Sequence, residues 1–109
     1  MTVEEVEAVI HLQVNEHPTA TNAHQLVLKD ALVRPRRISV IEKTVKDGQV
    51  FDQELRVWLI ADERPGDGYK IVMSDDGLRF WLASSGFSTD GHLVVSGWYN
   101  SLLAAFLGM

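Results

Sequence analysis

The dipeptide Asp47-Gly48, which stands between two strand-like runs, constrains the fold of this chain more than any other feature. Asp-Gly favours the two-residue turn of a β-hairpin, because both turn residues must accept a positive φ angle. If Lys46 pairs with Gln49, residues 38–61 form one long antiparallel hairpin. Its opposed pairs are Thr44/Phe51, Val40/Leu55 and Ile38/Val57 on one face, and Val45/Val50, Lys43/Asp52, Ser39/Arg56 and Arg37/Trp58 on the other. A register shifted by one residue would oppose two carboxylates, which disfavours it.

A second hairpin follows, and its turn contains Asp76-Gly77. With Asp75 opposite Leu78, the opposed pairs are Met73/Phe80 and Ile71/Leu82 on one face and Val72/Trp81 on the other. The residues between the two hairpins, 62–68, are polar with glycine and proline, which is typical of a loop. The two hairpins together therefore predict a four-stranded antiparallel meander.

Helices are expected before the first hairpin. Residues 2–15 predict a helix that opens with a capping box formed by Thr2 and Glu5 and ends at His17-Pro18. Its apolar stripe at helical spacing consists of Val3, Val6, Ile10 and Val14. Residues 23–32 form either a second short helix, with Asn22 as N-cap and Gln25 as its capping-box partner, or a strand. The pattern does not decide between these two alternatives.

The C-terminal part of the chain carries very little charge. From Phe80 to Met109 the only formal charge is Asp90, so most of this segment must be buried. Residues 84–90 predict an irregular loop, and residues 93–95 predict a short extra strand. Residues 97–107 predict an apolar helix with Ser96 as N-cap and Gly108 as a left-handed C-cap.

These elements predict a single α+β domain over residues 1–109, in which the N-terminal helix or helix pair and the C-terminal helix pack on the meander. The chain has no cysteine, which excludes a disulfide and a thiolate nucleophile. The N-terminus lacks the pattern of a secretory signal. The longest apolar run, residues 102–107, is far shorter than the roughly 20 residues that cross a bilayer. We therefore expect a cytoplasmic protein that does not enter a membrane.

No pattern predicts a catalytic or metal site, and no cofactor is expected. The histidines lack the spacing that places metal ligands on one helical face; they are His11, His17, His24 and His92. The acidic residues at 62–63, 67 and 75–76 fit turns better than calcium sites. The only basic cluster, residues 34–37, fits cations at the end of a helix, with Arg37 placed to stack on Trp58. Because the net charge is −5, nucleic-acid binding is disfavoured.

The sheet face that carries Trp58 and Trp81 poses the main functional question. We expect Ile60 to share this face, and cations to surround it: Arg37, Arg56, Lys70 and Arg79. Two interpretations carry about equal weight. Either a helix covers the face, or the face is an exposed aromatic patch with a cationic rim, which is the composition of a binding surface.

The leading hypothesis for function is a non-catalytic protein-interaction module, which binds a protein partner or a second copy of itself. Its binding residues would be Arg37, Arg56, Trp58, Ile60, Arg79 and Trp81. The apolar C-terminal helix favours a homodimer. The alternative hypothesis is a pocket for a small ligand or a simple reaction, between the sheet and residues 84–92. Its polar groups would be Arg79, Asp90 and His92.

Overall fold

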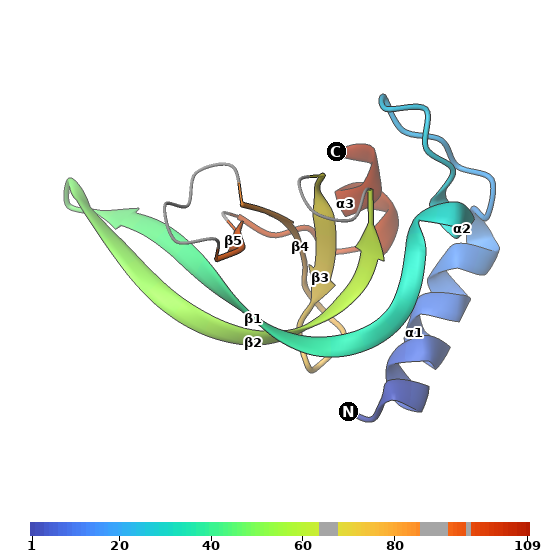
Figure 1. Cartoon of the computed structure of the whole chain (residues 1–109), viewed down its shortest axis with the longest axis horizontal. Coiled ribbons are helices and arrows are strands. Elements are labelled where there is room, and N and C mark those ends of the chain that lie inside the picture. The colour runs from blue at the N-terminus through green and yellow to red at the C-terminus, as the bar shows by residue number, and fades with distance from the viewer. Residues whose placement is uncertain (64–67, 86–91, 96) are drawn as a thin grey trace.

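The computed structural model of the chain describes residues 1–63, 68–85, 92–95 and 97–109. Its sheet is a closed barrel in which the strands are neighbours in chain order (Figure 1). The strands are β1 (Leu32–Lys46), β2 (Gln49–Asp62), β3 (Lys70–Met73), β4 (Phe80–Ser84) and β5 (Val94–Val95). The helices are α1 (Val3–Glu16), α2 (Leu28–Ala31) and α3 (Leu102–Leu107).

Closure of the barrel corrects the predicted open meander of four strands. The short strand β5 pairs antiparallel with β4 and parallel with β1, where Ile41 lies opposite Val94 and Glu42 opposite Val95. In an up-and-down sheet of five strands the first and the last run in the same direction, so their contact has to be parallel. The sheet is therefore mixed, and closure covers the edges that an open meander would expose.

Both predicted hairpin registers are confirmed. In the first hairpin Lys46 pairs with Gln49, and the ladder runs without interruption to Arg36 opposite Leu59. Asp47 and Gly48 have φ angles of 54° and 76°, which this turn type requires. In the second hairpin all three predicted pairs are present. In its turn Gly77 has a positive φ angle of 75°, whereas Asp76 does not have a positive φ.

Helix α1 forms as the sequence predicts. The Glu5 N–H donates to Thr2 Oγ1 at 3.2 Å and the Thr2 N–H donates to Glu5 Oε1 at 3.0 Å, so the capping box is complete. The side chains buried on this helix are Val6, Ile10 and Val14. Satisfied backbone donors at its start and an apolar stripe facing the sheet together stabilise the helix.

Of the two alternatives for residues 23–32, the helix is correct only for Leu28–Ala31, and its predicted N-cap at Asn22 is wrong. Asn22 Oδ1 accepts the N–H groups of His24 (3.0 Å) and Leu26 (3.1 Å), and this loop places Gln25 at a φ of 62°. Only the single turn of α2 follows, with Val27 as its N-cap residue. Asn22 thus caps a loop and not a helix. Both N–H groups that it binds turn toward its side chain, whereas in a helix they would point along the helix axis.

Helix α3 is shorter than predicted and has a different N-cap. Tyr99 and Phe80 exchange two backbone hydrogen bonds of 2.9 and 2.6 Å, which keeps the chain extended up to Ser101. Ser101 Oγ accepts the Ala104 N–H at 3.1 Å and caps the helix, whereas the predicted cap, Ser96, lies outside the described residues. Gly108 has a φ of −81°, so it is not a left-handed cap. A Cβ there would lie 2.6 Å from Tyr99 Oη, so any larger residue would force the Tyr99 side chain to shift.

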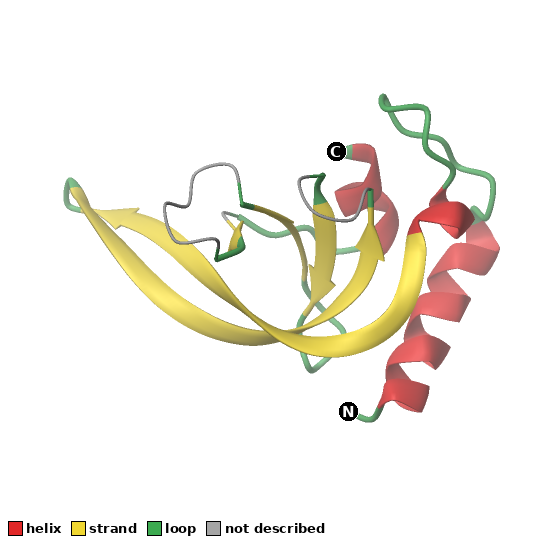
Figure 2. Cartoon of the chain, in the orientation of Figure 1, coloured by secondary structure: helices red, strands yellow, loops and turns green. Residues whose placement is uncertain are grey.

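The core has two layers. Buried side chains from all five strands fill the barrel interior: Val40, Val57, Leu59, Val72, Trp81, Ala83 and Val95. The second layer lies between the outer face of the sheet and the helices, and its largest members include Trp58, Ile60, Ile71, Met73, Phe80, Leu102 and Phe106. Figure 2 shows all three helices at one end of the molecule, opposite the tip of the β1–β2 hairpin. The prediction that terminal helices pack on a sheet is confirmed.

Candidate binding surfaces

The aromatic face expected from the sequence is buried. Trp58 and Trp81 are each only 4% exposed, and Ile60 is fully buried. They also lie on opposite faces of the sheet, since Trp58 and Ile60 belong to the helix-covered layer and Trp81 to the barrel interior. The reason is the register between the hairpins: Trp58 pairs with Met73, whereas the predicted face required it to align with Val72. These three side chains form core, so no exposed aromatic patch exists at them.

The four cations expected around that face are scattered. Lys70 is buried and its Nζ lies 3.3 Å from Asp62 Oδ1. Arg37, Arg56 and Arg79 are exposed, but they lie on β1, on β2 and just before β4. Of the six predicted binding residues, only these three arginines are accessible. Arg37 and Arg56 lie in neighbouring pairs on one face of the β1–β2 ribbon, whereas Arg79 belongs to the other hairpin.

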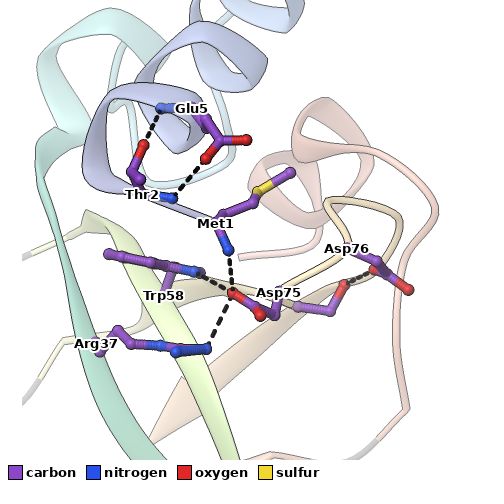
Figure 3. Close-up of polar contacts among 8 residues, drawn as sticks. Met1, Thr2, Glu5, Arg37, Trp58, Asp75 and Asp76 are labelled. Carbon is purple, nitrogen blue, oxygen red and sulfur yellow. Dashed lines mark hydrogen bonds and ion pairs between the residues drawn. The ribbon is translucent and has the colours of Figure 1, made fainter.

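Arg37 belongs to a cluster around the carboxylate of Asp75, which joins three parts of the chain (Figure 3). Asp75 Oδ1 accepts the indole N–H of Trp58 at 2.9 Å and lies 3.0 Å from Arg37 Nη2 and 3.3 Å from the N-terminal nitrogen of Met1. The guanidinium of Arg37 stacks 5.2 Å from the Trp58 ring centre, as predicted. The hydrogen bond from Trp58, then that from the N-terminus and the nearby charge of Arg37 lower the pKa of Asp75. The cluster ties α1 and the two hairpins together.

The neighbouring carboxylate, Asp76, acts within its own turn. Its Oδ1 accepts the Ser74 hydroxyl and, at 2.9 Å, the Leu78 N–H. The bond from Ser74, followed by that from Leu78, lowers the pKa of Asp76. The expectation that turn geometry accounts for this acidic pair is therefore confirmed for Asp76 but not for Asp75, whose carboxylate contacts Trp58, Arg37 and the N-terminus.

Arg79 stacks on an exposed residue, Trp98, whose exposure the sequence did not predict. Its guanidinium lies 5.4 Å from the ring centre of Trp98, an exposed side chain that had been assigned to the apolar helix. The backbone pairing of Tyr99 with Phe80 places Trp98 beside Arg79. A signal was present in the polar pair Asn100-Ser101, which directly precedes the apolar run and marks the true start of the helix.

The outer part of the β1–β2 hairpin, residues 43–54, is a second feature not assigned from the sequence. We call it the hairpin arm. Strand β1 contacts β5 at Ile41 and Glu42, and β2 contacts β3 from Trp58 onward, so the arm extends beyond both of these contacts. Near its tip Val45, Val50 and Phe51 are 74%, 62% and 49% exposed. Val45 and Val50 form one opposed pair, and Phe51 lies on the other face opposite Thr44. The arm thus presents apolar side chains on both faces.

The histidines and the 84–92 region offer no assembled chemical site among the residues described. His24 Nδ1 contacts the carboxylate of Glu63, and the His24 ring stacks on Tyr69, which fastens the 22–26 loop to the end of β2. No group of three or more His, Cys, Asp or Glu side chains in the described segments could hold a metal ion. Asp90, one of the polar groups of the alternative pocket, lies outside the described residues.

Comparisons with known proteins give no relative for this fold: no family model, no curated protein and no solved structure matches the chain. Among the described helices, none is long and apolar enough to cross a membrane. The inference of function therefore depends on the surfaces themselves.

Proposed function

We propose that this chain is a small, non-catalytic protein-interaction module and that the hairpin arm is its binding element. The observation that carries this proposal is the exposure of Val45, Val50 and Phe51 together at the tip of a projecting ribbon (Figure 1). Exposed apolar side chains scattered over a surface need no explanation, but three of them on adjacent residue pairs favour an interaction site.

The position of these side chains defines how a partner would contact them. Because Phe51 faces one side of the ribbon and Val45 and Val50 the other, a flat surface could cover only part of the apolar area. A cleft that encloses the tip would bury all three. Arg56, an exposed residue of β2 on the same face as Val50, extends the surface toward the barrel.

The arm is also built to hold its shape without a partner. The Asp47-Gly48 turn fixes the register, and Lys43 Nζ lies 3.1 and 3.2 Å from the two carboxylate oxygens of Asp52. A two-stranded ribbon alone is marginally stable in water, so its continuation into the barrel supports it. A preformed ribbon loses less conformational freedom on binding than a disordered segment does.

The test compares three forms of the full chain as bait in the cells that produce it: wild type, the Val50→Ser/Phe51→Ser variant, and Leu12→Gln. Leu12 is as exposed as the arm residues but lies on α1, so it is the matched control. We expect the same captured proteins with wild type and Leu12→Gln, and their loss with the arm variant. Retention of the same proteins by the arm variant would refute the role of the arm.

Self-association is the homodimeric form of the same proposal. Light scattering would then give a mass above the 12.2 kDa of one chain that falls to this value on dilution. In this case the arm variant has the monomer mass at every concentration, and Leu12→Gln behaves as wild type. A wild-type mass that stays at one chain excludes the homodimer and leaves a different protein as the partner.

A further inference from the structure

A pocket of about 430 Å³ lies between α1 and the start of β1. Figure 1 shows these two elements at the end of the molecule opposite the hairpin arm. It is lined by Glu7, Ile10 and His11 from the helix and by residues 32–35 of the strand. This volume falls within the range of small-molecule sites. It is large enough for a ligand of the size of an amino acid or a dipeptide.

The pocket exists because β1 bulges where it begins. Leu32 pairs with Ala61 and Arg36 with Leu59, so three residues of β1 lie opposite the single residue Ile60 of β2. The extra residues bow away from the ladder, and they include Pro35, which has no N–H to donate to it. Bulges commonly redirect side chains next to functional sites. Here the bulge turns Val33, Arg34 and Pro35 toward the helix.

The lining combines an apolar wall with three exposed polar side chains. Ile10, Leu32, Val33 and Pro35 provide the apolar part, and Ile10 and Pro35 are buried. Glu7, His11 and Arg34 provide the polar part. Within the described segments, none of these three side chains forms a hydrogen bond or an ion pair with another residue. The pocket therefore offers an anionic and a cationic group at once, and neither group is engaged by another side chain of the described residues.

We propose that this pocket binds a small zwitterion with an apolar side chain, namely an apolar α-amino acid or dipeptide. The guanidinium of Arg34 binds the carboxylate of the ligand, for which its forked donors are suited. The carboxylate of Glu7 accepts the ligand ammonium group, and the His11 imidazole adds a further hydrogen bond. The apolar side chain packs on Leu32, Val33 and Pro35. This site is independent of the interaction proposed for the hairpin arm.

The test is a titration of the ¹⁵N-labelled chain with phenylalanine and with the dipeptide Leu-Leu, followed by amide chemical shifts. We expect saturable shifts at residues 7–11 and 32–34, with a Kd on the order of 1 mM or below. The dipeptide binds more tightly if the natural ligand is a peptide, and phenylalanine does if it is a free amino acid. 3-Phenylpropionate and phenethylamine, which each lack one of the two charges, bind more weakly than phenylalanine.

Two variants separate the site from general surface charge. Arg34→Gln is expected to weaken binding about three- to tenfold, because a charge-assisted hydrogen bond is lost at a solvent-open site. Arg36→Gln removes an exposed arginine two residues away that does not line the pocket, and it leaves the Kd unchanged. Absence of saturable shifts with both zwitterions at about 10 mM overturns the proposal. Equal effects of the two arginine substitutions overturn it as well.

Discussion

Truncation of Phe51 is expected to cost less stability than truncation of the smaller residue Val57, although both side chains lie on the same face of β2. Phe51 is 49% exposed and Val57 is 2% exposed. Since full burial of a large apolar side chain contributes about 1.5–3 kcal/mol, Phe51→Ala should lower the free energy of unfolding by about 1 kcal/mol. Val57→Ala removes two buried methyl groups and leaves a cavity in the barrel, so it should cost about 2 kcal/mol.

Urea unfolding followed by tryptophan fluorescence measures both values, because Trp58 and Trp81 are buried in the two layers of the core. The m-values should stay equal, and Val57→Ala should lower the Tm by roughly 8 °C. Measurements at two protein concentrations about tenfold apart detect any contribution from association. A loss of about 3 kcal/mol or more in Phe51→Ala at both concentrations would mean that Phe51 is packed as in a core, and the arm would not be a free binding element.

Three further predictions concern contacts away from the arm. The hydrogen bond from Trp58 holds the pKa of Asp75 in the folded chain below its ordinary value. Its stabilisation is therefore present above that ordinary value and is lost as the pH falls through the lowered pKa, and Asp75→Asn should reduce this loss of stability in urea titrations from pH 5 to pH 2. Asn22→Ala should lower the free energy of unfolding by about 2 kcal/mol, because the N–H groups of His24 and Leu26 lose their acceptor; an unchanged calorimetric Tm would contradict this. Gly108→Ala should cost about 1–3 kcal/mol through the clash with Tyr99, and the double variant with Tyr99→Phe should recover part of that loss in the same calorimetric assay.

The sequence predicted each hairpin well because the information is local. The Asp47-Gly48 turn sets one register, and the opposed charges of Lys43 and Asp52 support it. The capping box at Thr2 is equally local, since its two partners lie three residues apart. In all of these cases a few neighbouring residues contain the whole physical reason for the structure.

The errors arose where distant segments meet. The β2–β3 ladder shifts its register between Leu59 and Ala61, and this shift decides which β3 side chains lie on the same face as Trp58. No pattern in the neighbouring residues predicts the shift. As a consequence, Trp58 and Trp81 were predicted to share a face that they do not share. The pairing of Tyr99 with Phe80 likewise prevents a helix from starting at residue 97, although the apolar pattern favours one. Tertiary pairing overrode local propensity at both places.

Closure of the barrel through β5 also sets the order in which the chain can assemble. Ile41 and Val94 lie about half the chain apart, and among the described residues one further pair, Glu42 with Val95, joins β1 to β5. The loop-closure entropy for this contact is large, whereas the β1–β2 hairpin closes over a two-residue turn. We therefore expect the hairpin to form early and the β1–β5 seam to form last. The same seam should open first in the native state, so the amide of Ile41, which donates to Leu93 O at 2.9 Å, should exchange with solvent faster than the amides at the centre of β3.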